Sequence, residues 1–214
     1  MILTAQLLDE FWSQLEQTVE QLKTTQPHEL PEHGERLLSP YRQRLAEIDN
    51  NLTLNVERQS EEGAVDLVFG CDGYPESIHT VLSLVDSAPK ISGVKVRAFN
   101  ERFDPVPHMV NLGGELISID EFWCSLRNIK GRLELAIYLE DAPQVLEMDP
   151  RVEAAMILLD ALLGEYEIMT RIWALDWFDL PVEPLDYGLI PLSGLRAEFD
   201  AMKAQVKPLG IQLH

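Results

Sequence analysis

The chain has 214 residues, of which 46% are hydrophobic and 25% charged, and its formal net charge is −19. This composition is typical of a folded globular protein and excludes a disordered chain. So negative a charge argues against nucleic acid and anionic membrane surfaces as partners, because phosphate groups require a basic protein face.

The features that report on location favour the cytoplasm. The two cysteines, Cys71 and Cys124, have no CxxC spacing and no small-domain framework around them, which favours a reducing compartment. The N-terminal residues lack the basic and apolar segments of a secretory signal, and no stretch approaches the roughly 18 apolar residues of a membrane span. We therefore expect a cytoplasmic protein, as a monomer or a homodimer.

Two helices are expected at the start of the chain. Apolar residues at helical spacing predict the first over about residues 4–24, with Thr4 as its N-cap, and the second over about residues 37–51. Pro27 and Pro31 interrupt the helical pattern between them. The pair should form a helical hairpin.

A strand, turn, helix and strand follow. Apolar and polar residues alternate over residues 52–56, which predicts a strand, and a second, apolar strand starts at Val65. A turn at residues 60–63 would make the two strands an antiparallel pair. The Val65 strand ends in the turn Gly70-Cys71-Asp72-Gly73. A helix over 75–87 then leads to a strand over 94–98, which a crossover would place parallel to the Val65 strand.

The second half of the chain predicts a β-meander and two helices. Its expected elements are strands over 109–112, 121–128 and 131–139, a helix from about Asp149 that Gly164 stops, a strand over 166–173, a loop over 177–191 and a final helix over 192–206. The fold class is α+β: a mostly antiparallel sheet with the helices at 75–87 and 150–163 packed on one face. We expect a single domain over residues 1–214, in which residues 1–50 form a helical extension of a core over 51–214.

The turn after the Val65 strand offers one candidate site. Asp72 lies on the turn and Glu76 one helical turn later, so the two carboxylates could hold a cation or act as acid and base. The same residues also suit a turn and a helix N-terminus, without any chemistry. Cys71 has only His79 as a basic neighbour, which favours a structural thiol.

No sequence motif for a metal or a cofactor is present. The densest group of metal-capable side chains is His28, Glu29, Glu32, His33 and Glu35. Pro31 lies inside this group and breaks the i,i+4 helical geometry that a zinc protease requires, and the spacing fits no structural zinc pattern. P-loop, GxGxxG, GxSxG and HExxH patterns are absent from the sequence. We expect no metal and no cofactor.

Negative charge is concentrated in residues 140–186, which carry twelve acidic residues against Arg151 and Arg171. Within this stretch Trp173 and Trp177 flank Asp176, and Asp179 follows. A ridge of aromatic and acidic side chains suits a surface that binds Lys or Arg. Glu165, at the helix-to-strand turn after Asp160, is a further candidate. The alternative is that the acidic residues only keep the protein soluble.

Four short segments resemble an uncharacterised family of bacterial proteins. In that family a strand ends in a Ser-Ala-Asp-Gly-like turn, matched here by Gly70-Cys71-Asp72-Gly73. The other matching segments are Ala88-Pro89, Ala98-Phe99 and the Leu-Asp-x-x-Leu-Gly-Glu-Tyr segment over Leu159–Tyr166. The resemblance covers about residues 52–170 and implies a shared fold without an activity. The turn departs from the family at Gly70-Cys71, which argues against a required hydroxyl there.

These observations favour a non-enzymatic, acidic, cytoplasmic protein that binds another protein through its second half. It would neutralise a basic partner as immunity proteins and inhibitors do. One alternative is a small-ligand binder or hydrolase-like enzyme with a carboxylate site at the Asp72 turn, facing the Glu165 turn across the sheet. Another is a structural subunit of a homo-oligomer, for which an exposed apolar stripe on the first helix would be the sign.

Overall fold

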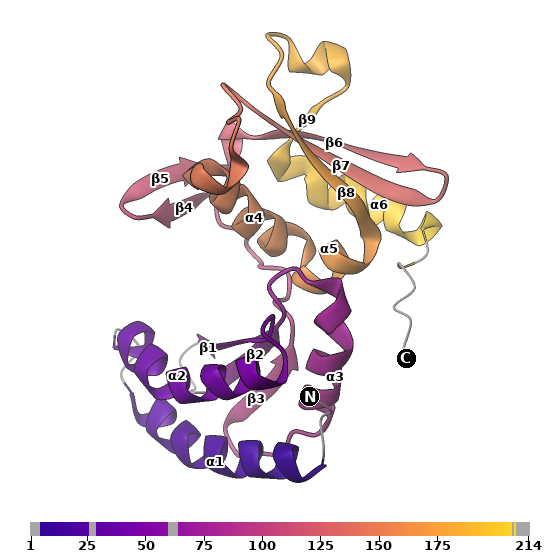
Figure 1. Ribbon diagram of the computed structural model, residues 1–214. Coiled ribbons are helices and arrows are strands. Elements are labelled where there is room, and N and C mark those ends of the chain that lie inside the picture. Colours follow the sequence, from indigo (N-terminus) through magenta and orange to yellow (C-terminus); the bar gives the residue numbers. More distant parts are fainter. Residues whose placement is uncertain (1–4, 26–28, 60–63, 207, 209–214) are drawn as a thin grey trace. The chain divides into compact units, whose positions relative to one another are not determined.

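The computed structural model describes residues 5–25, 29–59, 64–206 and 208 (Figure 1). The chain divides into two compact units, the first ending at Phe99 and the second beginning at Asn100. The fold class is α+β with mostly antiparallel strand pairs, and the N-terminal helical pair is present, as predicted. Thr4, Pro27 and the turn at 60–63 lie outside the described residues. No helix among those described is both long and apolar enough to cross a bilayer.

The described residues of the first unit form a three-stranded sheet and three α-helices. Its elements are α1 (Ala5–Thr24), α2 (Leu30–Ile48), β1 (Thr53–Gln59), β2 (Ala64–Gly70), α3 (Ile78–Asp86, after a 3-10 turn over Pro75–Ser77) and β3 (Val94–Ala98). The strand order is β1-β2-β3, with β1 antiparallel and β3 parallel to β2. Both predicted pairings are therefore confirmed.

The helical pair packs on this sheet through aromatic side chains. The rings of Phe11 and Trp12 on α1 contact Phe69 of β2 edge to face, with ring centroids 6.2 and 5.4 Å apart. Tyr41 of α2 packs against Phe11 in the same way, at 6.0 Å. Because all four side chains are buried, the helices share one hydrophobic core with the sheet.

The predicted break at Pro31 is wrong. Pro31 lies in the first turn of α2, where the N–H that proline lacks would have no helical acceptor. The helix therefore begins at Leu30 and continues through Pro40 to Ile48.

The described strands of the second unit form two separate sheets. Its elements are β4 (Met109–Leu112), β5 (Glu115–Ser118), β6 (Trp123–Ile129), β7 (Arg132–Leu139), α4 (Pro150–Leu163), α5 (Glu165–Arg171), β8 (Ile172–Asp179), β9 (Ile190–Pro191) and α6 (Leu195–Met202). β4 and β5 pair only with each other among the described strands, and the larger sheet has the order β8-β7-β6-β9. The predicted continuous meander is thus divided, and the described strands of the whole chain form three sheets instead of one.

One face of the larger sheet packs on α4 and α6 (Figure 1). Strand alternation sends Leu133, Leu135, Ile137 and Leu139 of β7 into this core, where they are almost completely buried. β8 runs parallel to β7, and α4 and α5 form the connection between the two strands.

The predicted strand over residues 166–173 is wrong for most of its length, because α5 occupies Glu165–Arg171. Gly164 has a φ of 86°, which ends α4 and lets the chain turn before a new helix starts. Acidic residues in the first turn of α5 and the ion pair between Glu167 and Arg171, four residues apart, favour the helix. The strand starts only at Ile172 and runs into the predicted 177–191 loop.

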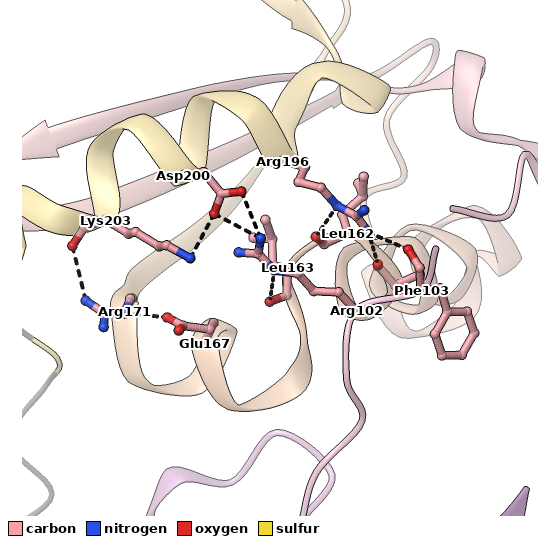
Figure 2. A network of polar contacts seen from close by, with 10 residues as sticks. Arg102, Phe103, Leu162, Leu163, Glu167, Arg171, Arg196, Asp200 and Lys203 are labelled. Atoms are coloured by element: carbon pink, nitrogen blue, oxygen red, sulfur yellow. Dashed lines mark hydrogen bonds and ion pairs between the residues drawn. The ribbon is translucent and has the colours of Figure 1, made fainter. Parts of the chain in front are cut away.

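The C-terminal end of α4 is held by arginine side chains (Figure 2). Arg196 donates hydrogen bonds to the carbonyl oxygens of Leu162 and Ala161 at 3.0 and 2.9 Å. Arg102 donates to the carbonyl of Leu163 at 3.0 Å and pairs with Asp200 of α6 at 2.9 Å. A helix leaves its last carbonyl groups without intrahelical donors, and cationic donors there also complement the helix dipole.

We predict that Arg196→Ala lowers the free energy of unfolding by about 2 kcal/mol, because charge-assisted hydrogen bonds to α4 and to the Phe103 carbonyl are lost. Arg196→Lys should lose most of the same stability, since an ammonium cannot reproduce the planar fork of donors. Urea unfolding would measure both variants.

The matched control is Arg127→Ala, which removes an exposed arginine from β6 and should change the stability by less than about 0.5 kcal/mol. Equal effects of the two alanine variants would contradict the role assigned to Arg196.

Candidate functional site

The face of the larger sheet that points away from α4 and α6 is open. Among the residues of this face, Ser125 is buried and the others are exposed or partly exposed. They are Trp123, Ser125, Arg127 and Ile129 of β6, Arg132, Glu134, Ala136 and Tyr138 of β7, Ala174, Asp176 and Phe178 of β8, and Pro191 of β9. We call this surface the open face.

A row of ring-bearing side chains crosses the open face from edge to edge. The strand register places Phe178 opposite Tyr138, Tyr138 opposite Trp123, and Trp123 opposite Pro191. The rings of Tyr138 and Phe178 are stacked, with centroids 5.4 Å apart and an interplanar angle of 28°. We call the three aromatic residues, Phe178, Tyr138 and Trp123, the aromatic row, and Pro191 lies beyond its end. Large, partly exposed rings side by side are typical of binding surfaces.

The β8–β9 loop, residues 180–189, extends beyond the strands at one end of the sheet (Figure 1). It is built around a 3-10 turn over Pro184–Tyr187, which Gly188 ends with a φ of 69°. Val182, Leu185 and Tyr187 on this loop are 95, 73 and 68% exposed. A loop that presents three large apolar side chains to solvent indicates an interaction site.

Nine of the twelve acidic residues of 140–186 fall into two groups. One group is engaged inside the second unit: Asp149 pairs with Arg151, Glu167 pairs with Arg171, Glu165 accepts from Asn100, and Asp179 accepts from the backbone of Ala142. The other group, Glu140, Asp141, Asp176, Glu183 and Asp186, is exposed, and no ion pair joins these side chains to any described residue. Three of the second group lie on the open face or the β8–β9 loop.

The four predicted site residues of β8 do not form one ridge. Asp176 points to the open face, but Trp177 faces the opposite way and packs against the core. Trp173 is half-exposed beneath the guanidinium of Arg132, which lies 3.7 Å from its ring centroid. The Asp179 carboxylate accepts a hydrogen bond from Ala142 at 2.8 Å. Successive side chains of a strand point to opposite faces of the sheet, so these residues are close in the sequence but do not share one surface.

Glu165 has a structural role that its hydrogen bonds define. Its side chain is buried and accepts from the backbone N and the Nδ2 atom of Asn100, at 3.1 and 3.4 Å. The Glu165 backbone N donates in return to the Asn100 carbonyl, at 3.0 Å. These contacts fix the start of α5 against the segment that begins the second unit.

Asp72 and Glu76 are exposed residues of the first unit, whereas Glu165 belongs to the second. Asp72, with a φ of 50°, and Gly73, with a φ of 78°, form a turn that the hydrogen bond from Tyr74 N to Cys71 O closes at 2.9 Å. These are the properties of a surface turn.

In the part of the chain that the structure describes, no three His, Cys, Asp or Glu side chains are grouped so that they could hold a metal ion. Of the sequence group around Pro31, His28 lies outside the described residues. His33 contacts Arg36 through Nδ1 at 2.5 Å.

Both thiols are buried, and neither is a candidate nucleophile. Burial, reinforced by the charge of Glu198, raises the pKa of Cys124 to about 12. A neutral thiol is a poor nucleophile, because the thiolate is the reactive form.

Comparisons with protein-family models, with curated proteins and with solved structures find no match for this chain.

The Asp149 carboxylate accepts from the backbone N of Arg151 at the start of α4 and pairs with the Arg151 guanidinium. Mainly through this side-chain hydrogen bond, its pKa is lowered from the ordinary value of 3.8. The resulting stability is present at neutral pH and is lost as the pH falls through the lowered pKa.

We predict that Asp149→Asn, which keeps an N-cap acceptor but loses the charge, is less stable than the wild type at pH 7. The difference should shrink as the pH falls below about 4, where the wild-type carboxyl also becomes neutral. Thermal unfolding at a series of pH values measures this, and a gap that is independent of pH would contradict the role of the charge.

We also predict that Cys71 and Cys124 react with a thiol reagent such as dithionitrobenzoate only after unfolding, because both side chains are buried in the folded chain. Reaction of either thiol at the rate of free cysteine in the absence of denaturant would contradict the burial. Cys71→Ser and Cys124→Ser variants assign the signal to one thiol.

Proposed function

We propose that this is a non-enzymatic cytoplasmic protein that binds a basic protein partner through the open face and the β8–β9 loop, in the manner of an immunity protein or inhibitor. The observation that carries the proposal is the combination, in one unit, of the aromatic row, three exposed apolar side chains on the β8–β9 loop, and exposed carboxylates that form no ion pair with any described residue.

Each part of this surface has a physical task in binding. Apolar side chains such as Leu185 and Tyr187 supply the buried contacts that carry most of the affinity of an interface. The carboxylates of Asp176, Glu183 and Asp186 attract a basic surface and set its orientation. The rings of the aromatic row can accept Lys or Arg side chains over their faces.

The charges of the sheet also define an orientation for the partner. The exposed cations Arg127, Lys130 and Arg132 lie at the tip of the β6–β7 hairpin, at the end of the sheet opposite to the β8–β9 loop. A basic partner is therefore repelled at one end and attracted at the other, which directs it to the end where the aromatic row and the loop lie.

We predict that changing Asp176, Glu183 and Asp186 together to Lys abolishes the capture of a basic partner without lowering the melting temperature, because these side chains are exposed. The measurement is an affinity pull-down from the native lysate at low and moderate salt, with bound proteins identified by mass spectrometry. The wild type should retain a near-stoichiometric basic protein that is released as the salt concentration rises.

The matched control is the triple change of Asp9, Glu16 and Glu47 to Lys, which alters the net charge equally but on exposed positions of α1 and α2. This control should capture the partner like the wild type. If both triple variants lose the partner equally, the effect is one of overall net charge. If both retain the partner equally, the proposed binding surface is wrong.

A further inference from the structure

β8 forms one edge of the larger sheet. It pairs with β7 from Ile172 to Asp179, and no other strand among the described residues lies beside it. The partial exposure of Leu175 and Trp177, which face the core, agrees with an uncovered edge.

The backbone groups on the outer side of β8 can be identified from one hydrogen bond. The N–H of Leu180 donates to the carbonyl of Leu139 on β7 at 3.0 Å. Because successive residues of a strand direct their N–H and C=O groups to opposite sides, those of Asp179, Trp177 and Leu175 point away from β7. A row of free donors and acceptors of this kind is a template for an additional strand.

Apart from the charges of Asp176 and Asp179, this edge lacks the features with which proteins usually protect such strands. Short length, proline, lysine and bulges all hinder pairing at an edge. β9, at the other edge of the sheet, has only two residues and includes Pro191, and β3 in the first unit carries an exposed lysine, Lys95. From Ala174 to Asp179, β8 contains no proline and no lysine, and its register shift lies earlier, opposite Leu133/Glu134.

The charge of the edge selects the kind of strand that can join it. Asp176 and Asp179 lie on β8, Glu183 and Asp186 follow on the loop, and no basic residue occurs from Ile172 to Asp186. An antiparallel second copy of β8 would bring these carboxylates close to one another, and like charges on adjacent strands destabilise the pairing. A basic segment would instead meet opposite charges at Asp176 and Asp179 and on the loop that follows.

We infer that the basic partner, whose existence rests on the proposed function, contributes an extended basic segment that pairs with the outer edge of β8 as an added strand. The backbone of Leu175, Trp177 and Asp179 supplies the hydrogen bonds. The carboxylates of β8 and of the loop select Lys and Arg side chains, and the aromatic row, which ends at Phe178, lies next to the added strand.

The test uses the full chain and a synthetic peptide in which Lys and Val alternate, with amide hydrogen exchange followed by NMR. On binding, exchange at the amides of Leu175, Trp177 and Asp179 should slow by at least about tenfold. The amides of Ala174, Asp176 and Phe178 point toward β7 and should change little. A peptide in which Glu and Val alternate should not bind.

A second peptide separates strand addition from simple charge attraction. N-methylation of two adjacent central residues prevents the Lys-Val peptide from pairing along either of its edges and leaves the charge of the peptide unchanged. We therefore expect the methylated peptide not to bind. If the methylated peptide binds as well as the parent, or if the three outer amides gain no protection, the inference is overturned.

The proposed function still stands in that case, provided that the triple change of Asp176, Glu183 and Asp186 to Lys abolishes binding of the parent peptide. If that variant binds the parent peptide like the wild type, the proposed function fails as well.

Discussion

The last carbonyl groups of α4 need hydrogen-bond donors inside the second unit, and the rest of that unit depends on which side chains supply them. Arg102 and Arg196 come from segments on either side of α4 in the sequence, and both donate to its last carbonyl groups. This capping allows the helix to stop at Gly164 without unpaired carbonyl groups in the interior. The chain can then turn directly into α5 and deliver β8 parallel to β7. The position of the open edge thus follows from a cap at the end of a helix.

Strand alternation then decides which charges are available to a partner. Residues 140–186, which carry over half of the net negative charge, include carboxylates that are bound inside the second unit, such as Asp149 at the start of α4 and Glu165 at the start of α5. Asp176 and Phe178 are left on the open face because Leu175 and Trp177 fill the core. A negative surface therefore emerges at one end of the sheet, although the acidic residues are spread along the chain.

Periodicity in the sequence was sufficient for the fold class and for most elements, because α1, α4 and the hairpin of β6 and β7 have long, regular apolar patterns. It failed at α5, a helix of only seven residues, whose short pattern cannot be distinguished from that of a strand. This error displaced β8, and with it the side-chain alternation that assigns Asp176 and Trp177 to opposite faces. The aromatic row could not be predicted, since Trp123, Tyr138 and Phe178 become neighbours only through the register of three strands. The alternation of β7 alone could have marked Tyr138 as outward-facing.

The charge of the chain has two explanations, solubility and binding, and the surface of the second unit distinguishes them. Solubility accounts for exposed carboxylates anywhere on the molecule, including those of α1 and α2. It does not account for Val182, Leu185 and Tyr187, because exposed apolar side chains on an ordered loop reduce solubility. Nor does it account for an edge strand without proline or lysine, which invites association. Acidic residues around such features have a consistent role, since they repel second copies of the chain and leave the surface open to a partner of opposite charge.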